Sequence, residues 1–392
     1  MTHQTPTRRR ESSIPVTPFA LSTATAAGRW SAAWASCLVY AGGQCLTILV
    51  VAAVAAARHR LSGSLWWSWD GRQFLYIASH GYTNSVAAHV SGSPAFFPGY
   101  PASMAGLAAV SRMPLPAAGI VVSACSGLVF AFGLHRLVTK VAGPDRGLGL
   151  LVVFLASVSP LSIVLSMVYS EALFCALAVW CLVAIVDRRW ITAGLLCLLA
   201  GTVRQTALAL VVAVVLAAVA AVRRRAATLR TWIAVALAPL GLLGYFSWVS
   251  VRTGHVTGWF EAERNGWHTY VDFGAGTERF SYRALVFAPA LLDVVTVAMV
   301  GLAVILLVAT AAGRVPVAVL AYSSVVLALD VFADGVMNSK VRLLVPAFTL
   351  LLPIGVWLRT QTPLARSTIL GCVAVAGTWY SSYALVIYGH AI

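Results

Sequence analysis

Residues 33–57, AWASCLVYAGGQCLTILVVAAVAAA, decide the fold class of this chain. The run contains no charged side chain and is long enough to cross the hydrocarbon core of a bilayer as one helix. Similar runs recur along the 392 residues, of which 60% are hydrophobic and 10% charged. A soluble domain of this composition would expose an almost wholly apolar surface, so we predict an all-α, polytopic membrane protein. About eleven transmembrane helices are expected, at 33–57, 117–138, 148–165, 168–186, 190–203, 206–222, 231–251, 284–309, 315–333, 341–358 and 367–388.

The net charge of +15 does not indicate a nucleic-acid partner, because the cations are scattered at the ends of apolar runs and form no basic domain. Their distribution follows the positive-inside rule if the N-terminus is cytoplasmic and the chain lies in the plasma membrane. We then expect residues 1–29 to form a disordered cytoplasmic tail and residues 30–392 a single transmembrane domain. The two longest loops, 58–116 and 252–283, fall outside, so any chemistry is expected at the extracytoplasmic face.

Metal and cofactor sites are not indicated. The seven Cys fall inside predicted spans without a CxxC pair, and no His, Asp or Glu cluster has the spacing of metal ligands. A Walker or GxGxxG loop following a strand is also missing from the sequence, so a bound nucleotide is not expected.

The first outer loop carries a carboxylate, Asp70, at the start of a predicted interfacial helix over 70–81. Its polar residues trace one face of that helix and its apolar residues the other, with three Trp just ahead. A carboxylate at the lipid–water boundary can accept a proton from a hydroxyl. Asp70 and Gln73 also form a D-x-x-Q capping box, which would need no catalysis.

The segment 95–101, AFFPGYP, follows in the same loop. Two prolines and a glycine are expected to prevent a regular helix, and irregular backbone at membrane depth must be buried or line a cavity. Its aromatic side chains would contact a sugar or a polyprenyl chain, or would anchor the loop at the interface.

Three motifs, in this order and spacing, resemble the PIG-V-type mannosyltransferases. They are WDGRQFLYIA with GY and AFFPGYP (69–78, 81–82 and 95–101), YSEALF (169–174) followed by GTVR (201–204), and a fainter RLLVP (342–346). This resemblance implies a GT-C fold with its active site on the outer or luminal side. It also implies a polyprenyl-phosphate-linked sugar donor, inversion at the anomeric carbon, and Asp70 as the general base.

The composition, rich in Ala and with two Lys among 27 cations, is typical of a bacterial genome. A bacterial relative would transfer mannose to a phosphoinositide-type lipid, a glycolipid or a cell-wall polymer. Inversion needs one carboxylate as base, and the departing lipid phosphate gains charge that fixed cations stabilise. The candidate phosphate-binding cations are Arg72, Arg204, Lys340 and Arg342.

Two of these assignments have structural alternatives. Arg204 could pair with Glu171, because both lie near the outer ends of neighbouring predicted spans. Lys340 and Arg342 could instead snorkel to the interface at the start of a span.

Further candidates come from the same loops. A cradle for the sugar or the lipid is predicted from Trp69, Tyr76, Phe97, Tyr100, Tyr169 and Glu171, and an acceptor-binding set from Trp259, Glu261, Trp267 and His268. Aromatic residues interleaved with acids suit a carbohydrate, and they equally suit an interfacial belt.

We therefore expect a membrane glycosyltransferase whose partners are membrane lipids, a polyprenyl-phosphate sugar and a lipid or glycolipid acceptor. A transporter or lipid flippase is the alternative, supported by two acids placed within spans, Asp293 and Asp330. The sequence shows no internal repeat, which weakens that alternative. A structural partner subunit is a third possibility.

Overall fold

The computed structural model describes residues 26–87, 90–287 and 290–388. Most of the predicted tail, residues 1–29, lies outside the described residues, and its last four residues already belong to the first helix. The α-helices are α1 Ala26–Ala57, α2 Asp70–His80, α3 Gly99–Ser111, α4 Leu115–Val141, α5 Arg146–Val158, α6 Glu171–Val186, α7 Trp190–Gly201, α8 Leu208–Arg223, α9 Leu229–Leu237, α10 Leu240–Thr253, α11 Gly258–Trp267, α12 Ala275–Val286, α13 Leu291–Ala312, α14 Val317–Val331, α15 Lys340–Leu343, α16 Leu351–Thr360 and α17 Pro363–Ser382. Within the described residues the β structure is limited to one isolated bridge between Val271 and Ala333.

The predicted apolar runs coincide with these helices. Among the described residues, six helical segments are long and apolar enough to cross a membrane, and a bent pair raises that number to seven. Shorter apolar helices, α5, α6, α7 and α14, occupy four of the remaining predicted runs. The all-α, multispanning class is therefore confirmed, whereas the count of about eleven spans stays a prediction.

Several boundaries differ from those expected, and three of these differences illustrate the causes. The run 231–251 is two helices, because Pro239 caps α10 and ends the backbone hydrogen bonding of α9. The run 341–358 is bent by 55° after α15. The run 284–309 starts inside α12, whose last residues are apolar, so hydropathy alone joins them to α13.

The bundle buries α6 at its centre, between α4, α7, α8 and α14. Almost every side chain of α6 is buried, and the helix begins at Glu171. In contrast, α13 exposes large apolar side chains such as Ile305 and Val308, as expected of a surface that faces lipid. The centre of the bundle therefore fixes the start of α6, where the second predicted motif lies.

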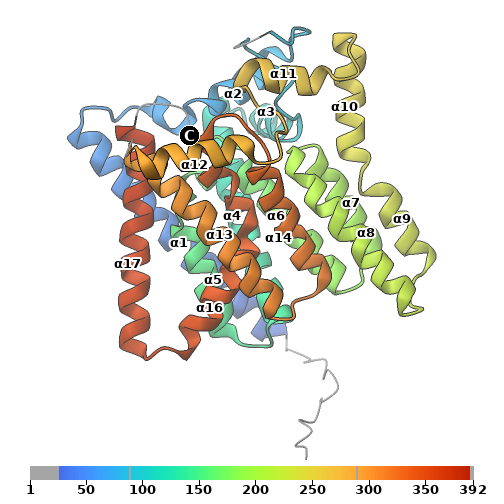
Figure 1. Cartoon of the computed structure of the whole chain (residues 1–392), viewed down its shortest axis with the longest axis vertical. Coiled ribbons are helices and arrows are strands. Elements are labelled where there is room, and N and C mark those ends of the chain that lie inside the picture. The colour runs from blue at the N-terminus through green and yellow to red at the C-terminus, as the bar shows by residue number, and fades with distance from the viewer. Residues whose placement is uncertain (1–25, 88–89, 288–289, 389–392) are drawn as a thin grey trace, which may run out of the picture.

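Figure 1 shows that the non-spanning helices α2, α3, α11 and α12 gather at one end of the bundle, at the top of the view. The connections between α8 and α9, α13 and α14, and α16 and α17 lie at the opposite end. The two long loops assigned to one side of the membrane thus share one end, which we call the loop end.

The segment 95–101 is only partly irregular. Helix α3 begins at Gly99, so Pro101 lies in its first turn, where the missing N–H of proline costs no hydrogen bond. The expectation that this segment excludes a helix is wrong from Gly99 onward. Gly99 donates its backbone N–H to the carbonyl oxygen of Thr202 at 2.7 Å. A Cβ on Gly99 would lie 2.9 Å from that oxygen, so this contact between the first and second motifs requires glycine.

Candidate active site

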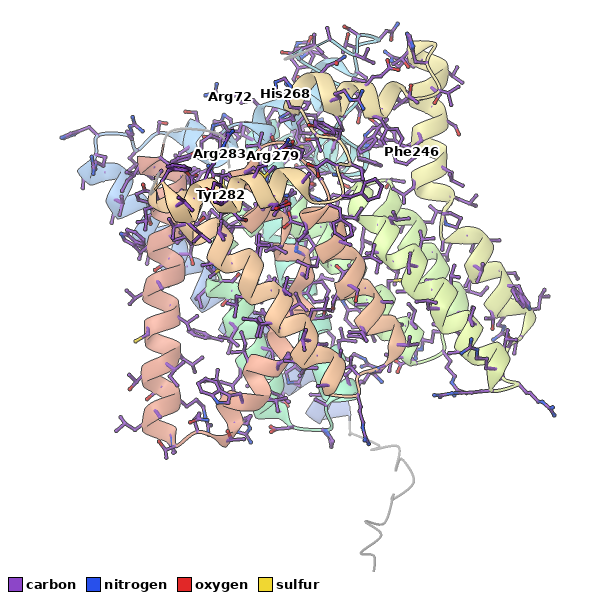
Figure 2. All side chains as sticks on the ribbon, viewed as in Figure 1. Arg72, Phe246, His268, Arg279, Tyr282 and Arg283 are labelled. Carbon is purple, nitrogen blue, oxygen red and sulfur yellow. The ribbon has the colours of Figure 1, made fainter. Side chains whose placement is uncertain are left out.

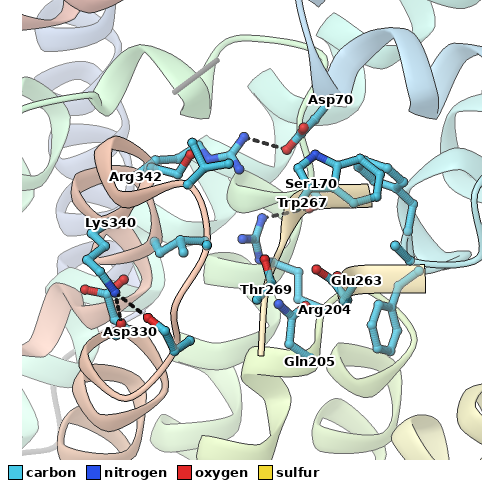
Figure 3. Close-up of a pocket in the computed structure, with 18 of the residues that line it drawn as sticks. Asp70, Ser170, Arg204, Gln205, Glu263, Trp267, Thr269, Asp330, Lys340 and Arg342 are labelled. Carbon is cyan, nitrogen blue, oxygen red and sulfur yellow. Dashed lines mark hydrogen bonds and ion pairs between the residues drawn. The ribbon is translucent and has the colours of Figure 1, made fainter. Parts of the chain in front are cut away.

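A polar cavity of about 140 Å³ lies at the loop end (Figure 3). Segments far apart in the sequence contribute to it. They are the start of α2, the segment 95–97, residues 203–205 before α8, the end of α11, and the stretch from the end of α14 to α15. Its charged lining residues are Asp70, Arg204, Glu263, Asp330, Asp334, Lys340 and Arg342. The cavity therefore combines residues from all three predicted motifs.

Asp70 begins α2 and lines this cavity. The residue before it, Trp69, adopts φ 51°, a left-handed conformation that is unusual for a residue with a bulky side chain. The carboxylate of Asp70 accepts a hydrogen bond from Nη1 of Arg342 at 2.5 Å. The D-x-x-Q capping box is not formed, because the Gln73 side chain bonds instead to the main chain of Val90 and Gly92.

Arg204 and Arg342 both lie close to the carboxylate of Glu171. Glu171 is fully buried, with its Oε1 2.7 Å from Nη1 of Arg204 and 3.7 Å from Nε of Arg342. It is the first residue of α6. The ion pair between Arg204 and Glu171 is therefore present, and Arg204 still lines the cavity.

These arginines keep unused hydrogen-bonding capacity. Arg204 donates one hydrogen bond to Oγ of Ser170 at 3.0 Å, and the guanidinium of Arg342 lies 5.3 Å from the ring centre of Tyr169. The Nε atoms of Arg204 and Arg342 are both buried without a hydrogen-bond partner. Two guanidiniums that line one cavity suit an anion with several oxygens, such as a phosphate.

Lys340 and Arg342 do not snorkel outward. Their exposed fractions are 4% and 8%, and both line the cavity. The ammonium of Lys340 donates to the main-chain oxygens of Asp330 and Ala333, the latter at 2.9 Å. Main-chain oxygens thus hold Lys340 at the wall of the cavity.

Glu263, on α11, is the carboxylate of the second loop that faces the cavity. Burial is the main cause that raises the pKa of Glu263 to about 8, and the nearby charge of Asp70 adds to it. The carboxyl is therefore mostly protonated at neutral pH. Helical spacing could have selected it, because Glu263 and the cavity residue Trp267 are four residues apart and share one face of α11.

Three residues of the predicted first-loop set lie outside the lining of the cavity. Arg72 is exposed on the surface (Figure 2), and Tyr76 stacks on His80 with ring centres 4.6 Å apart. Trp69 packs on the apolar cluster around α1.

Two predicted tyrosines are part of the core. Tyr100 is fully buried and donates to the carbonyl oxygen of Gly119. Tyr169 is also fully buried, and its hydroxyl donates to the carbonyl oxygen of Ser68. Of the predicted cradle, Phe97 lines the cavity and Glu171 lies behind it as the partner of the two arginines.

Of the four residues predicted to bind the acceptor, one lines the cavity. Trp267 lines the cavity and packs edge-on against Phe96. Trp259 is buried and donates its indole N–H to the carbonyl oxygen of Ala95 at 3.2 Å. Glu261 accepts from Oγ1 of Thr257 at 2.6 Å, and His268 is exposed at the end of α11 (Figure 2). The last two contribute nothing to the cavity.

Among the described residues, no group of three His, Cys, Asp or Glu side chains is placed to hold a metal ion. The side chains that line the cavity include carboxyl groups, cations and aromatic rings.

The fold is similar to that of a solved structure. Neither a family model nor a curated protein sequence matches the chain. The crystal structure of ArnT from Cupriavidus metallidurans bound to undecaprenyl phosphate matches with a TM-score of 0.54 at 13% sequence identity. The alignment covers 88% of this chain and 65% of the ArnT chain, so the chain spans about two-thirds of the length of ArnT. The likeness shows a shared fold, which agrees with the predicted all-α, GT-C-like membrane architecture.

Proposed function

We propose that this chain is a membrane glycosyltransferase. In this proposal it moves a mannosyl residue from a polyprenyl-phosphate donor to a lipid or glycolipid acceptor at the extracytoplasmic face, with inversion at the anomeric carbon. The observation that carries the proposal is one cavity that joins a carboxylate, Asp70, to two guanidiniums, Arg204 and Arg342, at one end of an apolar bundle. The resemblance of its motifs to PIG-V-type enzymes and the fold shared with ArnT, which was solved with a polyprenyl phosphate, support it.

An apolar groove beside the cavity supports an amphiphilic donor. The groove measures about 310 Å³ and is lined by apolar residues of α5, α13, α16 and α17 and of the bent segment between α15 and α16. Along α15 the lining alternates, because Lys340 and Arg342 line the polar cavity whereas Val341 lines the apolar groove. A ligand with a charged head and a long apolar chain matches this pairing of surfaces.

The mechanism assigns the cations to the phosphate. The donor's phosphate becomes the leaving group, and Arg204 and Arg342 stabilise the charge that it gains as the glycosidic C–O bond breaks. The acceptor hydroxyl attacks the anomeric carbon from the opposite side and gives its proton to the carboxylate of Asp70. This single displacement inverts the anomeric configuration, and it needs only one carboxylate as base.

Because of the ion pair between Asp70 and Arg342, donor binding precedes the release of the base in this mechanism. The two side chains are 2.5 Å apart, so the proposed base is held by the cation that the phosphate needs. A phosphate oxygen that takes the place of the carboxylate on Arg342 frees Asp70 to face the acceptor. Donor binding therefore prepares the base, and Glu263, mostly neutral at pH 7, adds little repulsion.

The test is transfer by the purified full chain. We expect radiolabelled sugar from polyprenyl-phosphate-mannose to appear on a lipid of a native extract, and Arg342→Gln to abolish the signal. Arg72→Gln is the matched control, because Arg72 is exposed outside the cavity lining. Label that crosses a liposome membrane while it stays on its carrier would indicate a flippase and would refute the proposal.

A further inference from the structure

One wall of the cavity holds a buried carboxylate that the transfer mechanism does not use. Asp330, near the end of α14, is 3% exposed and lines the cavity, and neither of its carboxylate oxygens has a hydrogen-bond partner. Buried carboxylate oxygens are almost always satisfied in folded proteins, and an ionisable side chain within a membrane helix is costly. Two unsatisfied acceptors at the wall of a cavity therefore indicate a ligand that donates hydrogen bonds.

Lys340 balances the charge of this carboxylate without donating a hydrogen bond to its oxygens. Its ammonium donates to the main-chain oxygens of Asp330 and Ala333, as Figure 3 shows. An ammonium has three donors, so one remains after these two bonds. Asp330 and Lys340 together thus offer two acceptors without partners and one remaining donor, and their opposite charges cancel.

The other carboxylate of this wall is already used. Asp334 accepts hydrogen bonds from the hydroxyl of Tyr270 at 3.0 Å and from the backbone N–H of Gly335 at 2.8 Å, and it pairs with Arg279. Asp330 is therefore the acidic group of this wall with free acceptors.

We propose that Asp330 and Lys340 form a subsite that binds neighbouring hydroxyl groups on the ring of the donor sugar. This inference rests on the proposed function. The two carboxylate oxygens of Asp330 accept from two adjacent hydroxyls, and Lys340 donates to a ring or hydroxyl oxygen. Because Lys340 already supplies a positive charge, the subsite favours a neutral hydroxylated sugar over one that carries an amino group.

The position of the subsite relative to the cations assigns it to the donor and not to the acceptor. Lys340 and Arg342 belong to the one-turn helix α15 and line the same cavity. In a polyprenyl-phosphate sugar only the glycosidic oxygen separates the ring from the phosphate. A phosphate on Arg342 therefore places the attached ring within reach of the wall that holds Lys340 and Asp330.

The experiment compares two lipids, polyprenyl phosphate and polyprenyl-phosphate-mannose, by their dissociation constants for the purified full chain in detergent. We expect the wild-type chain to bind the sugar-bearing lipid about 10- to 100-fold more tightly, as hydrogen bonds to a charged group imply. Asp330→Asn should remove most of this difference and leave the affinity for polyprenyl phosphate unchanged. Asp334→Asn is the matched control and should keep the difference.

The outcomes separate this inference from the proposed function. A wild-type chain that binds the two lipids equally, or an Asp330→Asn chain that weakens both lipids alike or neither of them, overturns the sugar subsite. The wild-type comparison needs no variant, so it decides the question even if Asp330→Asn does not fold. A wild-type chain that binds neither lipid overturns the proposed function and the subsite together.

Discussion

Replacing Asp70 by Asn should change donor binding and sugar transfer in opposite directions. In the proposed mechanism the phosphate competes with Asp70 for Arg342, across a contact of 2.5 Å between side chains that are 20% and 10% exposed. A hydrogen bond between charged groups contributes about 1.5–3 kcal/mol. Asparagine keeps the shape and loses the charge, so the competition falls by up to that amount. Polyprenyl phosphate should then bind about 10- to 100-fold more tightly.

Transfer should fall at the same time. Loss of a general base costs about 10²- to 10⁴-fold in rate, so kcat should drop by this factor while the dissociation constant of the lipid decreases. The two quantities are measured separately, by equilibrium binding of polyprenyl phosphate and by single-turnover transfer of labelled sugar.

A matched variant tests whether the effect is specific. Glu171→Gln removes one negative charge near the same arginine, 3.7 Å from its Nε, but Glu171 does not line the cavity. It should tighten lipid binding without a comparable loss of kcat. Equal losses of kcat in Asp70→Asn and Glu171→Gln would refute the assignment of Asp70 as base, and unchanged lipid affinity in Asp70→Asn would refute the competition for Arg342.

Three further predictions follow from the geometry of the cavity and its support. The pKa of about 8 at Glu263 means that this group becomes negative as the pH rises through 8, so the KM for the donor should be about tenfold higher at pH 9 than at pH 7, and Glu263→Gln should flatten this dependence. Arg204→Gln leaves the fully buried Glu171 without its 2.7 Å partner and should lower the free energy of unfolding, measured in detergent, by about 3–5 kcal/mol. The double variant with Glu171→Gln should recover much of this loss, and no recovery would contradict the pairing. Gly99→Ala places a Cβ 2.7 Å from Cγ2 of the valine beside Arg204 and should lower transfer at least about tenfold by shifting this arginine, whereas Gly106→Ala on the same helix meets no atom within 4 Å and should keep full transfer.

The fold class could be predicted from hydropathy because lipid-facing and buried helices are both apolar along their length. The breaks inside apolar runs could not be predicted from hydropathy. Pro239 divides one run, yet proline is tolerated in membrane helices, so its presence alone does not locate an end. The bend after α15 is followed closely by Pro346, in the first turn of the next segment, and a proline inside an apolar run does not by itself locate a bend.

The site was predictable where a charge interrupts an apolar or aromatic motif. Asp70, Arg204, Lys340 and Arg342 stand out in this way, and the cavity contains all four. Aromatic residues were less informative, because Tyr100 and Tyr169 fill the core with the same side chains that could bind a sugar. The ion-pair partners of these charged residues were harder to predict, since Arg342 and Asp70 are 272 residues apart in sequence.

The alternation of polar and apolar lining along α15 has a consequence for the route by which a lipid donor enters the site. The apolar groove is lined in part by Leu302, whose side chain is 39% exposed on the lipid-facing helix α13. A carrier approaching through water would have to expose its chain, at a cost of about 0.8 kcal/mol for each methylene. Sideways entry from the bilayer, past Leu302 and with Val341 on the route, avoids this cost. The rate of loading should then depend on how many carriers lie in the leaflet, and not on how many are dissolved.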